Sequence, residues 1–100
     1  MSVIKLNNES FDAAVKSGKA LVDFYADWCG PCRLLGPVVE QIAQENAHIK
    51  VGKINVDEDP QLAMRFQVSS IPLLVVMNGG EVVNQSLGVR PKAQILAMLP

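Results

Sequence analysis

The stretch Ala20–Ala26 (ALVDFYA), which runs into Asp27-Trp28-Cys29-Gly30-Pro31-Cys32, decides how this chain folds. The first seven residues are almost continuously apolar, which is typical of a strand buried on both faces of a parallel sheet. After the cysteines, apolar residues recur at helical spacing and predict a long amphipathic helix. Its apolar stripe consists of Leu35, Val38, Val39, Ile42 and Ala43. A second strand over Lys50–Val56 completes a strand–helix–strand unit, whose right-handed crossover makes the two strands parallel.

Further elements flank this unit on both sides. The remaining strands are predicted over Val3–Leu6, Leu73–Met77 and Glu81–Ser86. Three further helices are predicted: one that begins with Asn7 as its N-cap, a short one after Pro60, and one over Pro91–Leu99. Asn78-Gly79-Gly80 predicts a tight hairpin turn, and Pro37 predicts a kink within the long helix. Together they predict an α/β fold in a single domain over residues 1–100, with a mixed sheet of about five strands flanked by about four helices.

Composition excludes several classes of function. Hydrophobic residues make up 49% of the 100 residues and charged residues 19%, which is enough apolar material for a core and excludes a disordered chain. Nine basic residues against ten acidic ones give a net charge of −1, so we expect no binding to nucleic acid or to an anionic membrane. The longest apolar run, Leu73–Met77, is too short to span a bilayer. The N-terminal residues have no signal-peptide pattern, so a cytoplasmic protein is expected.

The two cysteines, Cys29 and Cys32, lie across the predicted start of the long helix. This spacing brings the sulfurs within reach of each other and places Cys29 near unpaired backbone N–H groups and the positive end of the helix dipole. Both effects favour the thiolate and lower the pKa of Cys29, and the thiolate is the nucleophile in disulfide exchange. Cys32 lies inside the first turn and is expected to be more shielded. Gly30 and Pro31 shape a tight turn between the cysteines.

A metal site is the main structural alternative for the cysteines. A zinc site requires four ligands, whereas the chain offers two cysteines and one histidine, His48, at the far end of the long helix. We therefore expect no metal in one chain and a surface position for His48. A site shared across a dimer would need metal in the purified protein.

Two charged residues stand out in the strands. Asp23 interrupts a strand that should be buried, where a carboxylate is costly unless it is paired or its pKa rises. It is either a proton acceptor for the thiol chemistry or a residue that reaches water or accepts a structural hydrogen bond. Lys53, in the neighbouring parallel strand, is placed to lie beside it and to moderate that rise, or else it faces solvent.

Trp28 and Pro72 are open to two interpretations each. Trp28, the only tryptophan, forms part of a surface for a partner protein, or packs in the core beneath the loop. Pro72 precedes an apolar strand, where it cannot donate to a sheet ladder. Taken alone, that position favours a trans peptide bond, since cis bonds are a small minority even before proline.

The run Trp28-Cys29-Gly30-Pro31-Cys32 resembles the active-site signature of the thioredoxin family. The resemblance extends over essentially the whole chain, in order and spacing. It includes Val22–Trp28, Pro37, Lys53–Asp57, Ile71-Pro72, Asn78–Val82 and Gly88. It implies the thioredoxin fold and a protein-disulfide reductase, in which Cys29 attacks the client disulfide and Cys32 resolves the mixed disulfide, leaving a Cys29–Cys32 disulfide.

The resemblance also assigns roles around the cysteines. Asp23 matches a buried acid that assists deprotonation of the resolving thiol, with Lys53 as its neighbour, and Pro72 matches a cis-proline. The substrate-binding residues it implies are Trp28, Gly30, Pro31, Ile71, Pro72 and Gly88. Client segments are expected to bind near the proline through main-chain hydrogen bonds.

The expected partners follow from the same resemblance. They are disulfide-containing client proteins and thioredoxin reductase, a flavoprotein that passes electrons from NADPH, while the chain itself is a monomer and binds no cofactor. Several positions depart from the common pattern: Tyr25 stands in place of Trp, Arg33 in place of Lys, Leu73 in place of Thr, and Gly79-Gly80 in place of Asn-Gly. The change at Leu73 leaves substrate preference open. A thiol oxidase or isomerase, and a binding subunit with non-essential thiols, are the alternative functions.

Overall fold

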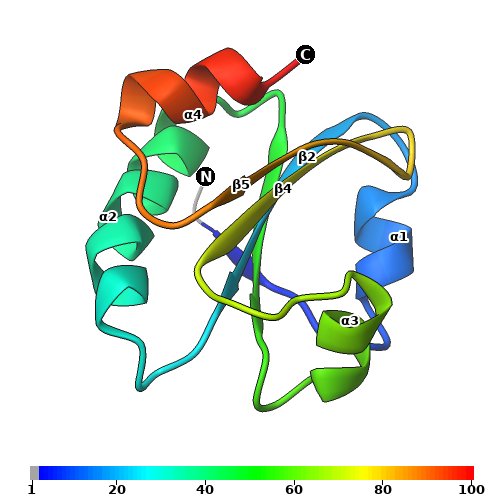
Figure 1. Cartoon of the computed structure of the whole chain (residues 1–100). Coiled ribbons are helices and arrows are strands. Elements are labelled where there is room, and N and C mark those ends of the chain that lie inside the picture. Colours follow the sequence, from blue (N-terminus) through cyan, green and yellow to red (C-terminus); the bar gives the residue numbers. More distant parts are fainter. Residues whose placement is uncertain (1–2) are drawn as a thin grey trace.

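The computed structural model describes residues 3–100 and contains one five-stranded sheet with helices on both faces (Figure 1). Residues 1–2 of the predicted domain lie outside the described residues. In chain order the elements are β1 (Ile4–Lys5), α1 (Phe11–Val15), β2 (Lys19–Tyr25), α2 (Gly30–Glu45), β3 (Lys50–Asn55), α3 (Pro60–Arg65), β4 (Leu73–Asn78), β5 (Glu81–Leu87) and α4 (Lys92–Met98). The predicted α/β fold, with its mixed sheet and four helices, is confirmed.

The strand order is β1-β3-β2-β4-β5. β3 runs parallel to both β1 and β2, which confirms the predicted strand–helix–strand unit around α2. β4 is antiparallel to both β2 and β5. The central strand β2 therefore ends beside β3 on one side and β4 on the other, and the loop that carries the cysteines leaves the sheet at that end.

Two apolar clusters cover the two faces of the sheet. Successive residues of a strand point to opposite faces, so Val22 and Phe24 pack toward α1 and α3, whereas Leu21 packs toward α2 and α4. Figure 1 shows the same pairing of helices, with α2 and α4 on one side of the sheet and α1 and α3 on the other. All three side chains are at most 1% exposed, and each contributes about 1.5–3 kcal/mol through burial.

Helix α1 begins later than its sequence predicts. The expected cap at Asn7 is wrong for the helix proper, which begins at Phe11 with Ser10 as its N-cap. Asn7 instead closes the turn before it, because its Oδ1 accepts from the Ser10 N–H at 2.8 Å and the Ser10 hydroxyl accepts from the Asn7 N–H at 3.0 Å. This reciprocal pair satisfies the backbone N–H groups of Asn7 and Ser10 in the turn that precedes the helix.

The predicted hairpin turn is confirmed. Gly79 and Gly80 have φ angles of 61° and 84°, the left-handed backbone that a two-residue hairpin loop requires and that glycine adopts without strain. Pro37 lies inside α2, as predicted, and the helix continues on both sides of it. No helix within residues 3–100 is long and apolar enough to cross a membrane.

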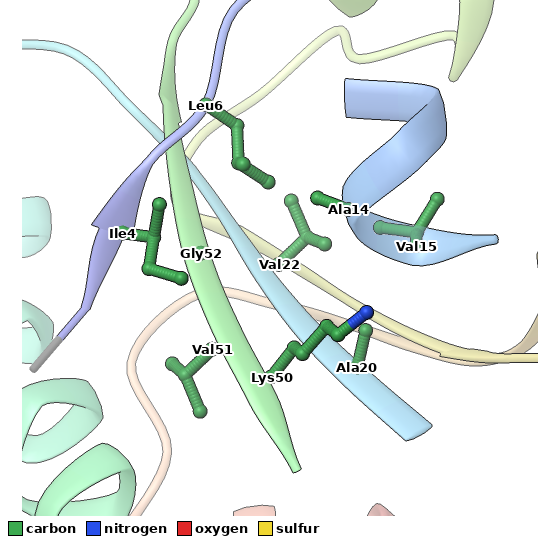
Figure 2. Close-up of a pocket in the computed structure, with 9 residues that line it drawn as sticks. All are labelled: Ile4, Leu6, Ala14, Val15, Ala20, Val22, Lys50, Val51 and Gly52. Carbon is green, nitrogen blue, oxygen red and sulfur yellow. The ribbon is translucent and has the colours of Figure 1, made fainter. Parts of the chain in front are cut away.

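A small apolar cavity lies between α1 and the edge of the sheet where β1 pairs with β3 (Figure 2). Leu6 lies over Gly52, and a Cβ on that glycine would come within 2.5 Å of Leu6 Cδ1. The cavity between these residues and α1 measures about 20 Å³, room for about one water molecule. Because its lining is almost wholly apolar, it is a packing gap between the strands and α1.

Candidate active site

The two cysteines lie at the N-terminus of α2. Cys29 is the N-cap residue, with an extended backbone (φ −90°, ψ 111°), and Pro31 occupies the first helical turn. A proline fits there because the first helical N–H groups have no partner within the helix. Cys29 and Cys32 form a disulfide with their Cα atoms 5.3 Å apart, which confirms that the spacing brings the sulfurs together.

The helix N-terminus polarises the sulfur of Cys29. The backbone N–H of Cys32 donates to Cys29 Sγ at 3.2 Å. In the reduced protein the same N–H and the positive end of the helix dipole favour a negative charge on that sulfur. Arg33 adds a cation next to the pair, and its guanidinium is held by the carbonyl oxygen of Asp27 at 2.7 Å.

The expected difference in shielding between the cysteines is wrong for the oxidised pair. Cys29 is 4% exposed and Cys32 is 6% exposed. Both pack with Ala26 against Tyr25, Val56 and Ile71. In the oxidised protein, therefore, neither cysteine presents more than a small exposed surface.

Asp23 and Lys53 occupy paired positions on β2 and β3. Asp23 is 4% exposed, and its Oδ1 has no hydrogen-bond partner among residues 3–100. Burial raises the pKa of Asp23 to about 7, and the positive charge of Lys53 opposes that rise. The ammonium group of Lys53 also lies 5.4 Å from the centre of the Tyr25 ring. Asp23 is therefore a buried residue in the middle of β2 and not a strand-end residue exposed to water.

A cavity of about 270 Å³ leads to this carboxyl group. It lies against α2, and its walls include Asp23, Lys53, Pro37 and Glu40. The Glu40 carboxylate also accepts the backbone N–H of Val3 at 3.3 Å, which fastens the segment before β1 to α2. Glu40 was missed from the sequence, because a glutamate on the polar side of a helix is ordinary. The cavity is roomy and polar enough to hold water beside Asp23.

Pro72 lies beside the cysteines, preceded by a cis peptide bond between Ile71 and Pro72. This confirms the bond that the resemblance implies and not the trans bond that the local sequence favoured. The carbonyl oxygen of Ile71 lies 3.9 Å from Cys29 Sγ. Gly88, with a φ of 88°, donates its N–H to the carbonyl oxygen of Pro72 at 2.8 Å. The chain thus brings Ile71, Pro72 and Gly88 together.

Trp28 is 68% exposed, so the interpretation that it packs in the core is wrong. Its indole N–H donates to the carboxylate of Asp57 at 2.8 Å, which holds the ring at the surface. A hollow of about 370 Å³ lies beside it, lined by Trp28, Val56, Val68, Ser69, Ser70 and Ile71. Ser69 and Ser70 were missed from the sequence, although their place directly before Ile71-Pro72 is a usable signal. Asp57 was also missed.

His48 is exposed, as expected. Within residues 3–100 no group of three or more histidine, cysteine, aspartate or glutamate side chains is placed to hold a metal ion. The cysteines in this fold are instead joined to each other. A disulfide at a helix N-terminus, in a fold that also holds a buried acid of raised pKa, is suited to dithiol–disulfide exchange.

Comparisons with known proteins agree with this chemistry. The family model described as Thioredoxin matches residues 2–100. The chain is 45% identical to a thioredoxin of Chlamydia pneumoniae over 87 residues, covering 87% of this chain and 85% of that protein. It is 40% identical to a thioredoxin of Staphylococcus haemolyticus over 100 residues, covering 99% and 96%.

A solved structure supports the same assignment. A mutant thioredoxin from Halobacterium salinarum NRC-1 superposes with a TM-score of 0.91 at 35% identity, over 98% of this chain and 88% of that one. The fold, the disulfide at the start of α2 and these relatives all agree. The chain therefore belongs to the thioredoxin family and is a thiol–disulfide oxidoreductase that reduces protein disulfides.

Proposed function

We propose that Cys29 is the attacking thiolate and Cys32 the resolving thiol. The Cys29 thiolate attacks one sulfur of a client disulfide, forming a Cys29–client bond and releasing the other client sulfur as a thiolate. The Cys32 thiol then loses its proton, attacks Cys29 Sγ and releases the second client thiolate. The client gains two electrons, and the Cys29–Cys32 disulfide remains. The observation that carries this assignment is the Cys32 N–H that donates to Cys29 Sγ at 3.2 Å.

Asp23 is the group that takes the proton from Cys32. A carboxyl group with a pKa of about 7 is close to the working pH, where a general base is most effective. Lys53 keeps that pKa from rising further, because its charge favours the carboxylate. The polar cavity beside α2 gives the proton a route from Asp23 to solvent.

The client lies against the surface formed by Trp28, Ile71, Pro72 and Gly88. Trp28 offers a large exposed apolar face, and the end of an extended client segment pairs with the main chain near Pro72 by strand addition. Gly30 and Pro31 complete the surface between the cysteines. A flavoprotein reductase that uses NADPH restores the dithiol at this same surface, and the chain carries no cofactor of its own.

The chain acts as a monomeric single domain in the cytoplasm, where thiols are kept reduced. It has no role in binding nucleic acid or membranes, since its net charge is −1.

The experiment is a trap for the mixed disulfide. Cys32→Ser removes the resolving thiol, so a client disulfide should leave a stable adduct on Cys29, located by mass spectrometry. Cys29→Ser should give no adduct under the same conditions. Adducts that form only through Cys32 would reverse the two roles. Equilibration of the wild-type protein with glutathione separates a reductase from an oxidase, because a disulfide that glutathione reduces readily belongs to an oxidase.

A further inference from the structure

Leu73, one of the departures from the common family pattern, has no part in the proposed chemistry. It is the first residue of β4, directly after Pro72, and it is 8% exposed. Its side chain belongs to the cluster on the α1 and α3 face. There it lines a hollow of about 350 Å³ between β5 and the segment that precedes Ile71. The residues around this hollow, here called the Leu73 pocket, are Gln67, Ser69, Ser70, Leu73, Gln85, Ser86 and Leu87.

The Leu73 pocket is continuous with the surface beside the disulfide. Ser69 and Ser70 line both this pocket and the hollow beside Trp28. Leu73 and Leu87 are paired across β4 and β5, one residue along from the Pro72–Gly88 hydrogen bond on each strand. The pocket therefore lies within reach of an extended client segment that pairs with the main chain near Pro72.

The lining of the pocket carries no charge. The buried Leu73 and the exposed Leu87 supply its apolar side chains, and the exposed Gln67 and Gln85 supply side-chain amides at its rim. Gln85 is placed on this face by its register, because it pairs with Val75, a member of the same cluster. A charged client side chain would find no counter-ion in this lining, whereas an uncharged one would make both apolar contacts and hydrogen bonds.

Gln67 has an unusual backbone for its type. Its φ is 55°, and it is the one non-glycine residue within residues 3–100 with a positive φ. Such a conformation costs a non-glycine residue free energy and is concentrated at functional sites. Here it carries an exposed amide side chain at the rim of the pocket, where glycine would offer no side chain at all.

We propose that the Leu73 pocket is a specificity subsite that receives an uncharged client side chain, near the reactive cysteine, and disfavours both acidic and basic ones. The proposal rests on the proposed function, because it concerns the same client segment. It assigns Leu73 and Leu87 to the apolar contact and Gln67 and Gln85 to hydrogen bonds with the end of that side chain.

The test uses peptides whose single cysteine is joined by a disulfide to thionitrobenzoate. The Cys29 thiolate of the reduced protein attacks the peptide sulfur, and release of the coloured thiolate gives the rate constant. Leucine, glutamine, glutamate and lysine are placed in turn at each of three positions on either side of the cysteine. At one position, both neutral residues should react at least fivefold faster than both charged ones. Equal rates at every position, or rates that follow peptide charge in one direction, would overturn the proposal.

A charge of either sign, introduced at Gln85 on the rim of the pocket, gives a sharper test. Gln85→Glu should raise the ratio of the lysine-peptide rate to the glutamate-peptide rate at that position, and Gln85→Lys should lower it, each by about tenfold. Asn84→Glu and Asn84→Lys are matched controls, because Asn84 is its exposed neighbour in β5 and pairs with Val76 of the opposite cluster. They should leave the ratio as in the wild type.

Two outcomes separate the proposals. If the Asn84 variants change the ratio as much as the Gln85 variants, long-range electrostatic attraction explains the rates. That result would overturn the proposed subsite but not the proposed function. A wild-type protein that reacts with none of the peptides would contradict the proposed function itself, and the pocket with it.

Discussion

Asp23 and Lys53 stand opposite each other on the parallel strands β2 and β3, and both line the cavity of about 270 Å³ beside α2. One of them is a carboxyl group with its pKa raised to about 7 by burial, and the other is the cation that limits this rise. The pair places a carboxyl group of near-neutral pKa in a cavity against α2, the helix whose N-terminus carries the cysteines. Because its pKa is raised on folding, its titration changes the stability of the fold with pH, and the proposed mechanism adds a role for it in deprotonating Cys32.

Replacing Asp23 should change how stability depends on pH. Its folded pKa of about 7 lies above its ordinary value of 3.8, so the unfolded chain ionises first and the wild type loses stability as pH rises from about 4 to about 7. Asp23→Asn removes this loss. The free energy of unfolding of the variant minus that of the wild type should therefore increase by about 3–4 kcal/mol between pH 4 and pH 8. Urea unfolding of the oxidised proteins at both pH values measures it.

The control for that experiment is Asp12→Asn, an exposed carboxylate paired with Arg65 at 2.8 Å. Because this variant keeps Asp23, it should keep the loss of stability between pH 4 and pH 8 that Asp23→Asn lacks. An Asp23→Asn protein with the wild-type slope would show that Asp23 titrates normally.

Removing the cation beside Asp23 should move its titration upward. Lys53→Met takes away the charge that favours the carboxylate, so the pKa of Asp23 should rise further and Asp23 should be less able to accept a proton at neutral pH. Resolution of the Cys29–client bond by Cys32 should then slow at pH 7 and recover at higher pH. Lys50→Met, an exposed lysine of the same strand, is the matched control, and equal pH profiles for the two variants would contradict the role of Lys53.

Gln67→Gly should stabilise the fold. With φ at 55°, Gln67 bears the cost of a left-handed backbone, which exceeds the extra chain entropy that a glycine loses on folding. We expect a gain of about 0.5–1 kcal/mol in the free energy of unfolding, measured in urea. Gln61→Gly, in the first turn of α3, should instead lose stability, by up to about 1 kcal/mol. A loss of similar size at both positions would show that the Gln67 backbone is unstrained.

The sequence was sufficient for most of the architecture because its patterns are local. The apolar run of β2 and the stripe on α2 identify a strand and a helix directly, and the handedness of crossovers then makes β2 and β3 parallel. The position of β1 next to β3 follows from long-range packing of Leu6 over Gly52, which no local pattern encodes. The start of α1 was missed because Asn7 and Ser10 cap a turn before the helix.

The site was predicted in part for the same reason. The C-x-x-C spacing at a helix start identifies Cys29 and Cys32, and an acid within an apolar strand identifies Asp23. The cis bond at Pro72 came only from the resemblance, since cis and trans prolines have the same local sequence. Glu40, Asp57 and the two serines before Ile71 were missed, because their positions depend on how distant segments meet.

Titration of the Cys29 thiol in the reduced protein tests the account most directly. The absorbance of the thiolate near 240 nm, compared between Cys32→Ser and Cys29→Ser proteins, gives the pKa of each sulfur. The N-cap position of Cys29 and the N–H of Cys32 predict a pKa for Cys29 clearly below the ordinary value of about 8.5, together with rapid attack on disulfides at pH 7. A Cys29 that titrates like a free cysteine and reacts no faster than one would contradict it.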